Sequence, residues 1–127
     1  MKTGKGPRGK RWWAGTACWA GLIFFLSSRQ SFPAPSPFPG FDKLVHMALF
    51  GTLCLLLFRA LASSRRRTPF HATALLSVLL AFFYGITDEM HQAFVPGRSC
   101  DAFDALADLA GAILTAAILF RLPSFRK

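Results

Sequence analysis

Residues 44–62, LVHMALFGTLCLLLFRALA, decide the fold. Within these 19 residues the side chains that carry charge or an imidazole are His46, near one end, and Arg59, near the other. A helix that crosses a bilayer needs about 20 mainly apolar residues. The run also lacks the two-residue alternation of a half-buried strand. We therefore expect a membrane-spanning helix here.

Three more apolar runs occur, at residues 12–28, 70–87 and 105–120. Each lies between turn-forming or charged residues, so the sequence predicts an all-α integral membrane protein, a four-helix bundle. The last run is the shortest and contains Asp108. The first run follows a basic segment and has a cleaved signal peptide as its alternative, but it shows no clear small-x-small cleavage site.

The composition supports a membrane protein and disfavours other classes. Of 127 residues, 53% are hydrophobic and 17% are charged, whereas soluble domains carry about 25% charged residues. The three cysteines show neither the spacing of a metal cluster nor that of a disulfide framework. We expect a basic tail at 1–11, one four-helix membrane domain at 12–120 and a second basic tail at 121–127.

The charges predict how the protein is oriented. Twelve of the 15 Lys and Arg residues lie in the N-terminal tail, in 59–67 or in the C-terminal tail, and all six acids lie in or beside the other two loops. Basic loops stay in the cytoplasm. Both termini should therefore be cytoplasmic, and the acidic loops should lie at the outer face of the cytoplasmic (inner) membrane. Because orientation signals and anionic-lipid contacts explain the net charge of +9, we expect no nucleic-acid partner. Alternating prolines from Pro33 to Pro39 favour an extended loop before the second helix.

Polar side chains mark the outer start of the second helix. Asp42 fits an N-cap, and His46 lies one turn deeper on the same face. A histidine inside a membrane boundary costs free energy unless it has a partner. Two interpretations stay open, a capped helix with a hydrogen-bonded histidine and a functional site.

The outer end of the third helix carries the segment YGITDEMHQ at 84–92. Helical spacing places four of its side chains on one face, with Glu89 turned away by about 100°. These four are Tyr84, Asp88, His91 and Gln92. Asp88 and His91 are spaced as an acid–histidine pair, which fits a general acid–base couple, half of a metal site or a structural hydrogen bond.

Two more patterns follow along the chain. FVPGR at 94–98 fits a type II turn, whose N–H groups and Arg98 would hold a phosphate or a carboxylate, or whose Arg98 would pair with a nearby acid. The last helix then carries a stripe of Asp104, Asp108, Gly111 and Thr115. Asp104 fits a cap, and the two small residues let a neighbouring helix approach, which would bring Asp108 near His46 and His91.

These patterns predict one polar pocket beneath the outer surface. Two histidines and several carboxylates suit zinc or another divalent ion in residue type. Because neither HExxH nor CxxC occurs, we predict no metal site and no cofactor. The residues expected to converge are Asp42, His46, Asp88, His91, Arg98, Asp104 and Asp108.

Three segments in combination resemble the VanZ-like membrane proteins, a family named for a teicoplanin-resistance protein. They are FLSSRQS at 25–31, FDKLVHMALFGTL at 41–53 and YGITDEMHQAFVPGRSCDAFDALADLAG at 84–111. Two positions depart from the family pattern, since Asp108 stands where Asn is frequent and Thr115 replaces a second glycine. The resemblance implies a small multi-helix membrane protein that acts at the outer face of the membrane, in envelope or lipid-linked chemistry. The ligand-binding residues that it implies are Asp42, His46, Asp88, Glu89, His91, Gln92, Arg98, Asp104 and Asp108.

Three functions fit these residues. The first is binding of membrane lipids or of a lipid-linked, anionic cell-wall component, with Arg98 in the anion site and a link to teicoplanin susceptibility. The second is a membrane-embedded hydrolase or transferase of a lipid-linked substrate, which would use an Asp–His pair. Its candidate catalytic residues are Asp88, His91, His46 and Asp108. The third is a structural polar network without a ligand.

Overall fold

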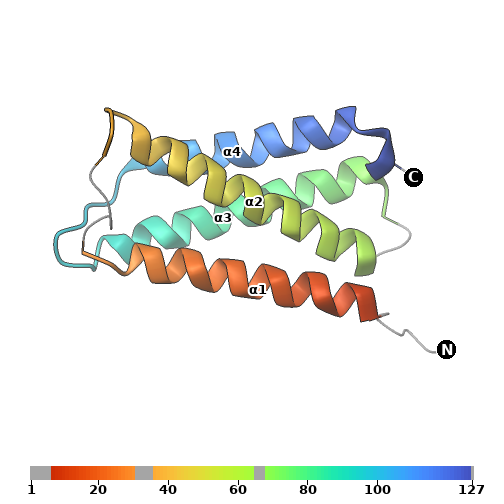
Figure 1. The fold of residues 1–127 in the computed structure, drawn as a ribbon, viewed down its shortest axis with the longest axis horizontal. Coiled ribbons are helices and arrows are strands. Elements are labelled where there is room, and N and C mark those ends of the chain that lie inside the picture. Colours follow the sequence, from red (N-terminus) through yellow and green to blue (C-terminus); the bar gives the residue numbers. More distant parts are fainter. Residues whose placement is uncertain (1–6, 31–35, 65–67, 127) are drawn as a thin grey trace.

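The computed structural model describes residues 7–30, 36–64 and 68–126. Within these ranges the chain forms helices and no strand (Figure 1), which confirms the predicted all-α class. The elements are α1 (Pro7–Ser27), α2 (Phe41–Ser64), α3 (Phe70–Gln92), α4 (Ala102–Arg121) and a short 3-10 helix, η1 (Pro123–Phe125).

Three of the four long helices, α2, α3 and α4, are long and apolar enough to cross a membrane. Large apolar side chains cover their outer surfaces, as shown by Leu75, Phe83 and Leu114, which are 61%, 60% and 53% exposed. Such surfaces are soluble in lipid and not in water. The prediction of spanning helices is therefore supported for these three, and the crossing by α1 stays a prediction.

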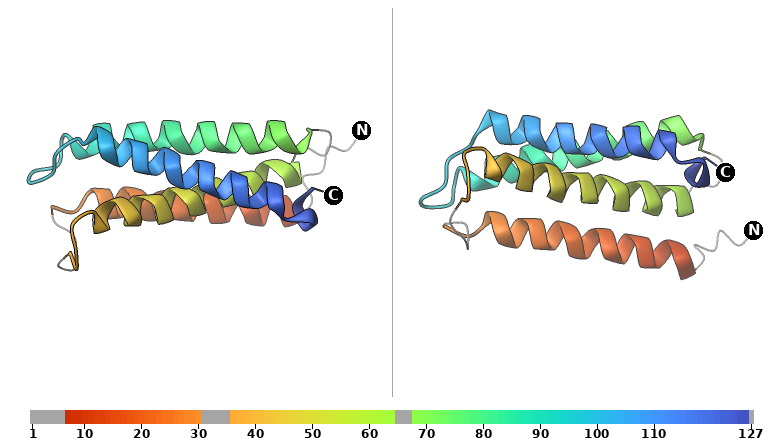
Figure 2. Two further views of the ribbon diagram at one scale, coloured as in Figure 1. Left: turned by 90° about the horizontal axis from the view of Figure 1, so that it is seen from above. Right: turned by 45° about the horizontal axis from the view of Figure 1, so that its top comes forward.

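The helices run alternately up and down, so α1 begins and α4 ends at the same end of the bundle (Figures 1 and 2). At the opposite end, α1 and α3 end and α2 and α4 begin. We call this opposite end the polar end, because all six acids of the chain lie in or beside its helix termini and loops. The predicted segregation of charge therefore matches the two ends of the bundle.

Helix α2 lies at the centre of the packing, because its contacts with the other three long helices are the most extensive in the bundle. Its side chains Phe50, Leu53 and Cys54 are buried and pack against Ile23 of α1. Toward the other end of the bundle, the indole N–H of Trp13 donates to Ser64 Oγ at 2.8 Å. The core thus fixes α1 on one side of α2.

Small residues let α2 and α4 approach closely, as the sequence predicts. A Cβ at Gly111 would lie 2.3 Å from the carbonyl oxygen of Met47, and a Cβ at Gly51 would lie 2.9 Å from Thr115 Oγ1. Thr115 also donates to the carbonyl of Gly51 at 3.1 Å. This contact sets the depth at which Asp108 of α4 faces α2.

Several sequence predictions lie outside the described residues. They concern the tail positions 1–6 and 127, the basic run 65–67, and the proline-containing segment 31–35.

Candidate functional site

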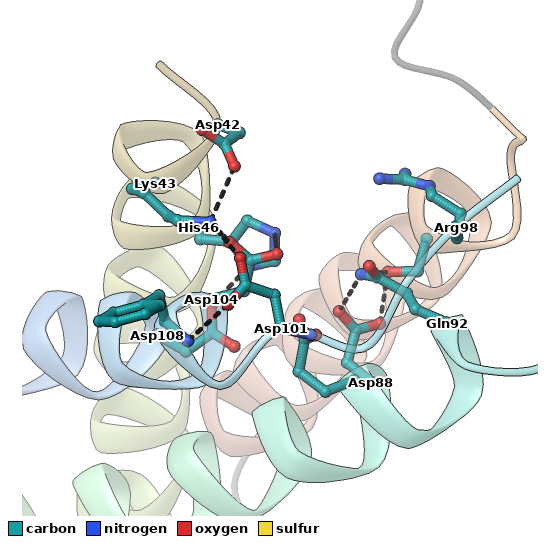
Figure 3. A network of polar contacts seen from close by, with 12 residues as sticks. Asp42, Lys43, His46, Asp88, Gln92, Arg98, Asp101, Asp104 and Asp108 are labelled. Atoms are coloured by element: carbon teal, nitrogen blue, oxygen red, sulfur yellow. Dashed lines mark hydrogen bonds and ion pairs between the residues drawn. The ribbon is translucent and has the colours of Figure 1, made fainter. Parts of the chain in front are cut away.

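The polar end contains two groups of polar side chains, one between α2, α3 and α4 and one between α1 and α3 (Figure 3). Lys43 of α2 organises the first group. Its ammonium lies 3.0 Å from Asp42, 2.8 Å from Asp101 and 2.5 Å from Asp104. Three carboxylates thus share one cation, which joins the start of α2 to the start of α4.

Two predicted helix caps are wrong. Helix α2 begins at Phe41, so Asp42 lies in its first turn and pairs with Lys43 instead of capping. Helix α4 begins at Ala102, and its N-cap is Asp101, whose carboxylate accepts from the N–H of Phe103 at 2.8 Å. Asp104 lies in the first turn, where the positive end of the helix dipole also favours a carboxylate.

The Lys43 ammonium holds the pKa of the Asp101 carboxyl below its ordinary value of 3.8. The N–H of Phe103 lowers this pKa further. Asp101 therefore stays ionised at any pH near neutrality.

His46 lies deeper than Lys43 on α2 and contacts two acids of α4. Its Nδ1 lies 2.7 Å from Asp108 Oδ1, and its Nε2 lies 3.7 Å from Asp104 Oδ2. Asp108 is fully buried. Gly85 of α3 makes this possible, because a Cβ there would lie 2.7 Å from Asp108 Oδ2. The expected proximity of His46 and Asp108 is confirmed.

Glu89 of α3 faces this first group. It is 3% exposed, and its Oε2 accepts from the backbone N–H of Asp101 at 3.0 Å. The side chain of Glu89 thus points away from the common polar face of α3, as predicted, and toward the start of α4. Glu89, His46 and Asp108 each offer a ligand atom, and these atoms lie within 4.8 Å of one another. These three residues, the His46–Glu89–Asp108 trio, have the donor types that a metal ion takes.

The second group joins α3 to α1. The predicted common face of α3 is confirmed, since Tyr84 donates to the carbonyl of Ala20 at 2.6 Å and Asp88 accepts from Ser27. Gln92 donates to Asp88 at 3.2 Å. Asp88 is 5% exposed, so this carboxylate is held by α1 inside the bundle.

The expected pairing of Asp88 with His91 is wrong, because among the described residues each of them contacts a serine instead of the other. His91 Nε2 instead lies 2.9 Å from Ser28 Oγ, and its ring stacks on Phe24 at a centroid distance of 4.5 Å. Ser28 already donates its one hydroxyl proton to the carbonyl of Phe24 at 2.7 Å. It therefore accepts from the imidazole, which is the reverse of what an activated serine nucleophile needs. Because His91 lies against α1, it does not make the predicted approach to Asp108 in the described part of the chain.

Among the described residues, Arg98 pairs with backbone carbonyls and not with one of the nearby acids that the sequence offered as a partner. Its Nε donates to the carbonyl of Arg29 at 2.8 Å, and its second guanidinium nitrogen donates to that of Leu26 at 3.1 Å. These carbonyls lie at the C-terminal end of α1, where the helix dipole favours a cation. The preceding turn is confirmed, because the N–H of Arg98 bonds to the carbonyl of Val95 and Gly97 has a φ of +80°.

A small cavity of about 30 Å³ lies where the two groups meet. Its polar wall comes from α1, α2, α3 and the loop before α4, and its apolar wall comes from α1 and α2. The polar lining residues are Ser27, His46, Asp88, Gln92 and Arg98, and the apolar ones are Ile23, Leu26, Val45, Leu49 and Phe50. Four of these polar residues belong to the predicted site.

Sequence reasoning missed three residues that shape the site. Ser27 has no partner assigned from the sequence, yet its hydroxyl donates to Asp88. Asp101 was not singled out, although an acid two residues before Phe103 and before an apolar helix is an N-cap signal. Gly85, four residues before Glu89, could have been noticed as a small residue in an apolar helix, which signals a close neighbour.

Comparison with known proteins gives the family. The model of the VanZ/LLP1 family matches residues 12–123, which is nearly the whole chain. A protein of Schizosaccharomyces pombe described as uncharacterized is 32% identical over 93 residues, which cover 73% of this chain and 55% of that protein. The chain therefore spans about half the length of this curated relative. No solved structure matches. The resemblance seen in the sequence motifs is thus confirmed, and the chain belongs to the VanZ/LLP1 family.

Proposed function

We propose that the protein binds a lipid-linked component at the polar end of its bundle. The cavity between α1, α2 and α3 supports this function most directly, because one wall is apolar and the other consists of hydrogen-bonding and charged groups. This combination fits the polar group of an amphiphile, which would reach Ser27, His46 and Asp88. With about 30 Å³, the cavity takes a small polar group and leaves the chain in the lipid.

The orientation belongs to this proposal. The described basic residues Arg8, Lys10, Arg11, Arg121 and Arg126 lie at the end of the bundle opposite the polar end. The rule that basic segments stay in the cytoplasm then places the polar end at the outer face of the cytoplasmic membrane. There the site would meet lipid-linked envelope components.

A photo-crosslinking residue placed at Val45 tests the proposed binding. Val45 lines the cavity, whereas Leu75 is 61% exposed on α3 and provides a lipid-facing control. Crosslinking in native membranes, followed by mass spectrometry of the attached lipid, should find a lipid-linked species enriched at Val45 over Leu75. The same bulk lipids at both positions would contradict the proposal.

A narrower proposal concerns teicoplanin, which carries a lipid tail and binds cell-wall precursor termini. A protein that holds lipid-linked precursors at the outer face would alter access to them. Expression of the wild-type chain should therefore change teicoplanin susceptibility relative to expression of Asp88→Ala. Equal susceptibility, at equal amounts of protein in the membrane, would contradict the link.

A second candidate function, a hydrolase or transferase of a lipid-linked substrate, is favoured by the contact between His46 and Asp108. A histidine oriented by a buried carboxylate is suited to general acid–base chemistry. His46 lines the cavity and would take a proton from an attacking water or hydroxyl group, while Asp108 would stabilise the imidazolium.

A lipid whose head group is joined through a phosphoester tests this second function. The wild-type protein should release the head group, and His46→Gln should lower the rate by about 100-fold or more, as is typical for loss of a general base. Release at the same rate by both proteins would contradict this role of His46.

A further inference from the structure

Two buried carboxylate oxygens at the polar end have no hydrogen-bond partner among the residues that the structure describes. They are Oε1 of Glu89 and Oδ2 of Asp108, on residues that are 3% and 0% exposed. A buried polar atom without a partner costs free energy, and a buried charge costs more. These two atoms are therefore the clearest sign in the described part of the chain that a ligand completes the site.

The charge around these atoms calls for a cation. All six acids of the chain lie in or beside the polar end. Lys43 is already shared by three aspartates, and the Arg98 contacts that the structure gives are with backbone carbonyls. An anionic head group alone would meet negative potential here, whereas a divalent ion would offset it.

We propose that His46, Glu89 and Asp108 bind one divalent metal ion of the Zn²⁺ or Mn²⁺ class. Their ligand atoms lie within 4.8 Å of one another, and two carboxylates with one imidazole suit these ions. A tetrahedral ion with bonds of about 2.1 Å holds neighbouring ligands about 3.4 Å apart, so His46 Nδ1 and Asp108 Oδ1, which lie 2.7 Å apart, would separate by less than about 1 Å to admit it. This inference departs from the absence of a metal site predicted from motif spacing.

The surrounding residues fit the second layer of a metal site. A histidine that binds a metal through one nitrogen usually donates its other N–H to a carboxylate. With Nδ1 on the ion, Nε2 of His46 faces Asp104 at 3.7 Å, and Lys43 holds Asp104 in place. The backbone N–H of Asp101 orients Glu89 by donating to its Oε2. Three protein ligands leave coordination positions open.

The metal site would also affect how the lipid-linked component binds, and this step rests on the proposed function. An ion with open positions would bind a phosphate or carboxylate of the lipid-linked component directly, which gives an acid-rich site its affinity for an anion. Coordination to the ion would also occupy Nδ1 of His46, the nitrogen that faces Asp108. Any hydrolysis would then be metal-assisted, with the proton transfer assigned to a residue other than His46.

Metal titration of the full chain in detergent, without lipid substrate, tests the ion site. After removal of metal with a chelator, Zn²⁺ and Mn²⁺ are added separately, and stoichiometry and affinity are measured by calorimetry and native mass spectrometry. The wild-type protein should bind one ion. Glu89→Gln and Asp108→Asn should each weaken binding by about 10-fold or more, since even loss of supporting residues costs 10- to 100-fold.

Asp42→Asn is the matched control, because it removes one negative charge at the polar end from an exposed side chain in the first turn of α2 and leaves the trio intact. It should retain the wild-type stoichiometry and an affinity within about threefold. Equal losses in all three variants would show nonspecific attraction to the acidic end and would overturn the proposal. A folded wild-type protein that binds neither ion would overturn it as well.

Electron paramagnetic resonance of bound Mn²⁺ supplies a measurement on the wild-type chain alone, in case the variants fold poorly. It should show a nitrogen coupling from the imidazole of His46, and its absence at full occupancy would contradict the assignment. Because these measurements use no lipid, they separate the two proposals. Ion binding without lipid capture at Val45 would reject the proposed function alone, and lipid capture without ion binding would reject the metal site alone.

Discussion

Single carboxylates at the polar end differ in role according to which cation or donor they meet. Asp101 combines two roles, since it caps α4 and shares the ammonium of Lys43. Asp88, in contrast, is buried against Ser27 and Gln92. Both residues are aspartates, so their different roles follow from the neighbouring side chains and not from the residue type.

The pH dependence of stability should reveal the charge of Asp101. Its pKa in the folded protein lies below 3.8, so its contribution is present above this pH and is lost as the pH falls through the folded pKa. Asn can replace Asp as an N-cap but cannot pair with Lys43. The wild type should therefore lose its advantage in thermal stability over Asp101→Asn as the pH falls below about 4. Melting curves in detergent between pH 7 and pH 3 check this, and a constant difference would contradict it.

Arg98 should stabilise the end of α1. Arg98→Ala removes two charged hydrogen bonds to carbonyls, at Arg29 and Leu26, so we expect the free energy of unfolding to fall by about 1–3 kcal/mol. Arg98→Lys should restore only part of this, because an ammonium lacks the planar fork of a guanidinium. Unfolding of purified protein in mixed detergent checks both variants. An unchanged stability of Arg98→Ala would reject the cap.

At the scale of elements, the approach of α2 and α4 depends on residues without large side chains. Gly111→Ala should destabilise the protein by about 1–3 kcal/mol, because the new Cβ would lie 2.3 Å from the backbone oxygen of Met47 and must push the helices apart. Gly21→Ala is the control, since nothing lies within 4 Å of its Cβ position. It should be neutral or slightly stabilising, as alanine favours helix. Comparable loss of stability in both variants would contradict the role of the close contact.

The sequence predicted the helices and their faces well because hydrophobic length and helical spacing are local properties. The apolar run at 44–62 lies inside α2, and the stripe from Asp104 to Thr115 does face a neighbouring helix. What spacing could not give is which neighbour a polar side chain meets. Asp88 and His91 are one turn apart, yet Asp88 binds Ser27, the last residue of α1, and His91 binds Ser28, which follows it, because α1 lies beside that face of α3.

Cap positions were harder to predict for a related reason. Two acids, Asp101 and Asp104, stand near the start of α4, so the first residue with helical backbone decides which one caps. Asp101 rather than Asp104 has this place in α4. The partners of Arg98 could not be predicted for a similar reason. They are backbone carbonyls at the C-terminal end of α1, which are far from Arg98 in the sequence and close to it only in the fold.

The whole molecule has a basic end and an acidic, polar end. This predicts that Cys100, which is exposed in the loop between α3 and α4, faces out of the cell. In a variant that lacks Cys18 and Cys54, a maleimide that cannot cross membranes should label Cys100 in intact cells. Labelling that requires permeabilised cells would reverse the orientation.

The whole bundle is needed to build the site, because α1 supplies Ser27, α2 supplies His46, α3 supplies Asp88 and α4 supplies Asp108. This explains how a chain of 127 residues can form a defined polar site at a membrane boundary. It also means that the site forms only when all four helices pack.

Native mass spectrometry of the detergent-purified protein tests the central claim, that the polar end binds a lipid-linked component. The wild type would be measured beside Asp88→Ala, which alters the cavity, and Asp101→Asn, which lies outside it, with helicity checked by circular dichroism. We expect a lipid-linked adduct on the wild type and on Asp101→Asn, and none on Asp88→Ala. Folded proteins that carry no adduct in all three samples, or the same adduct in all three, would contradict it.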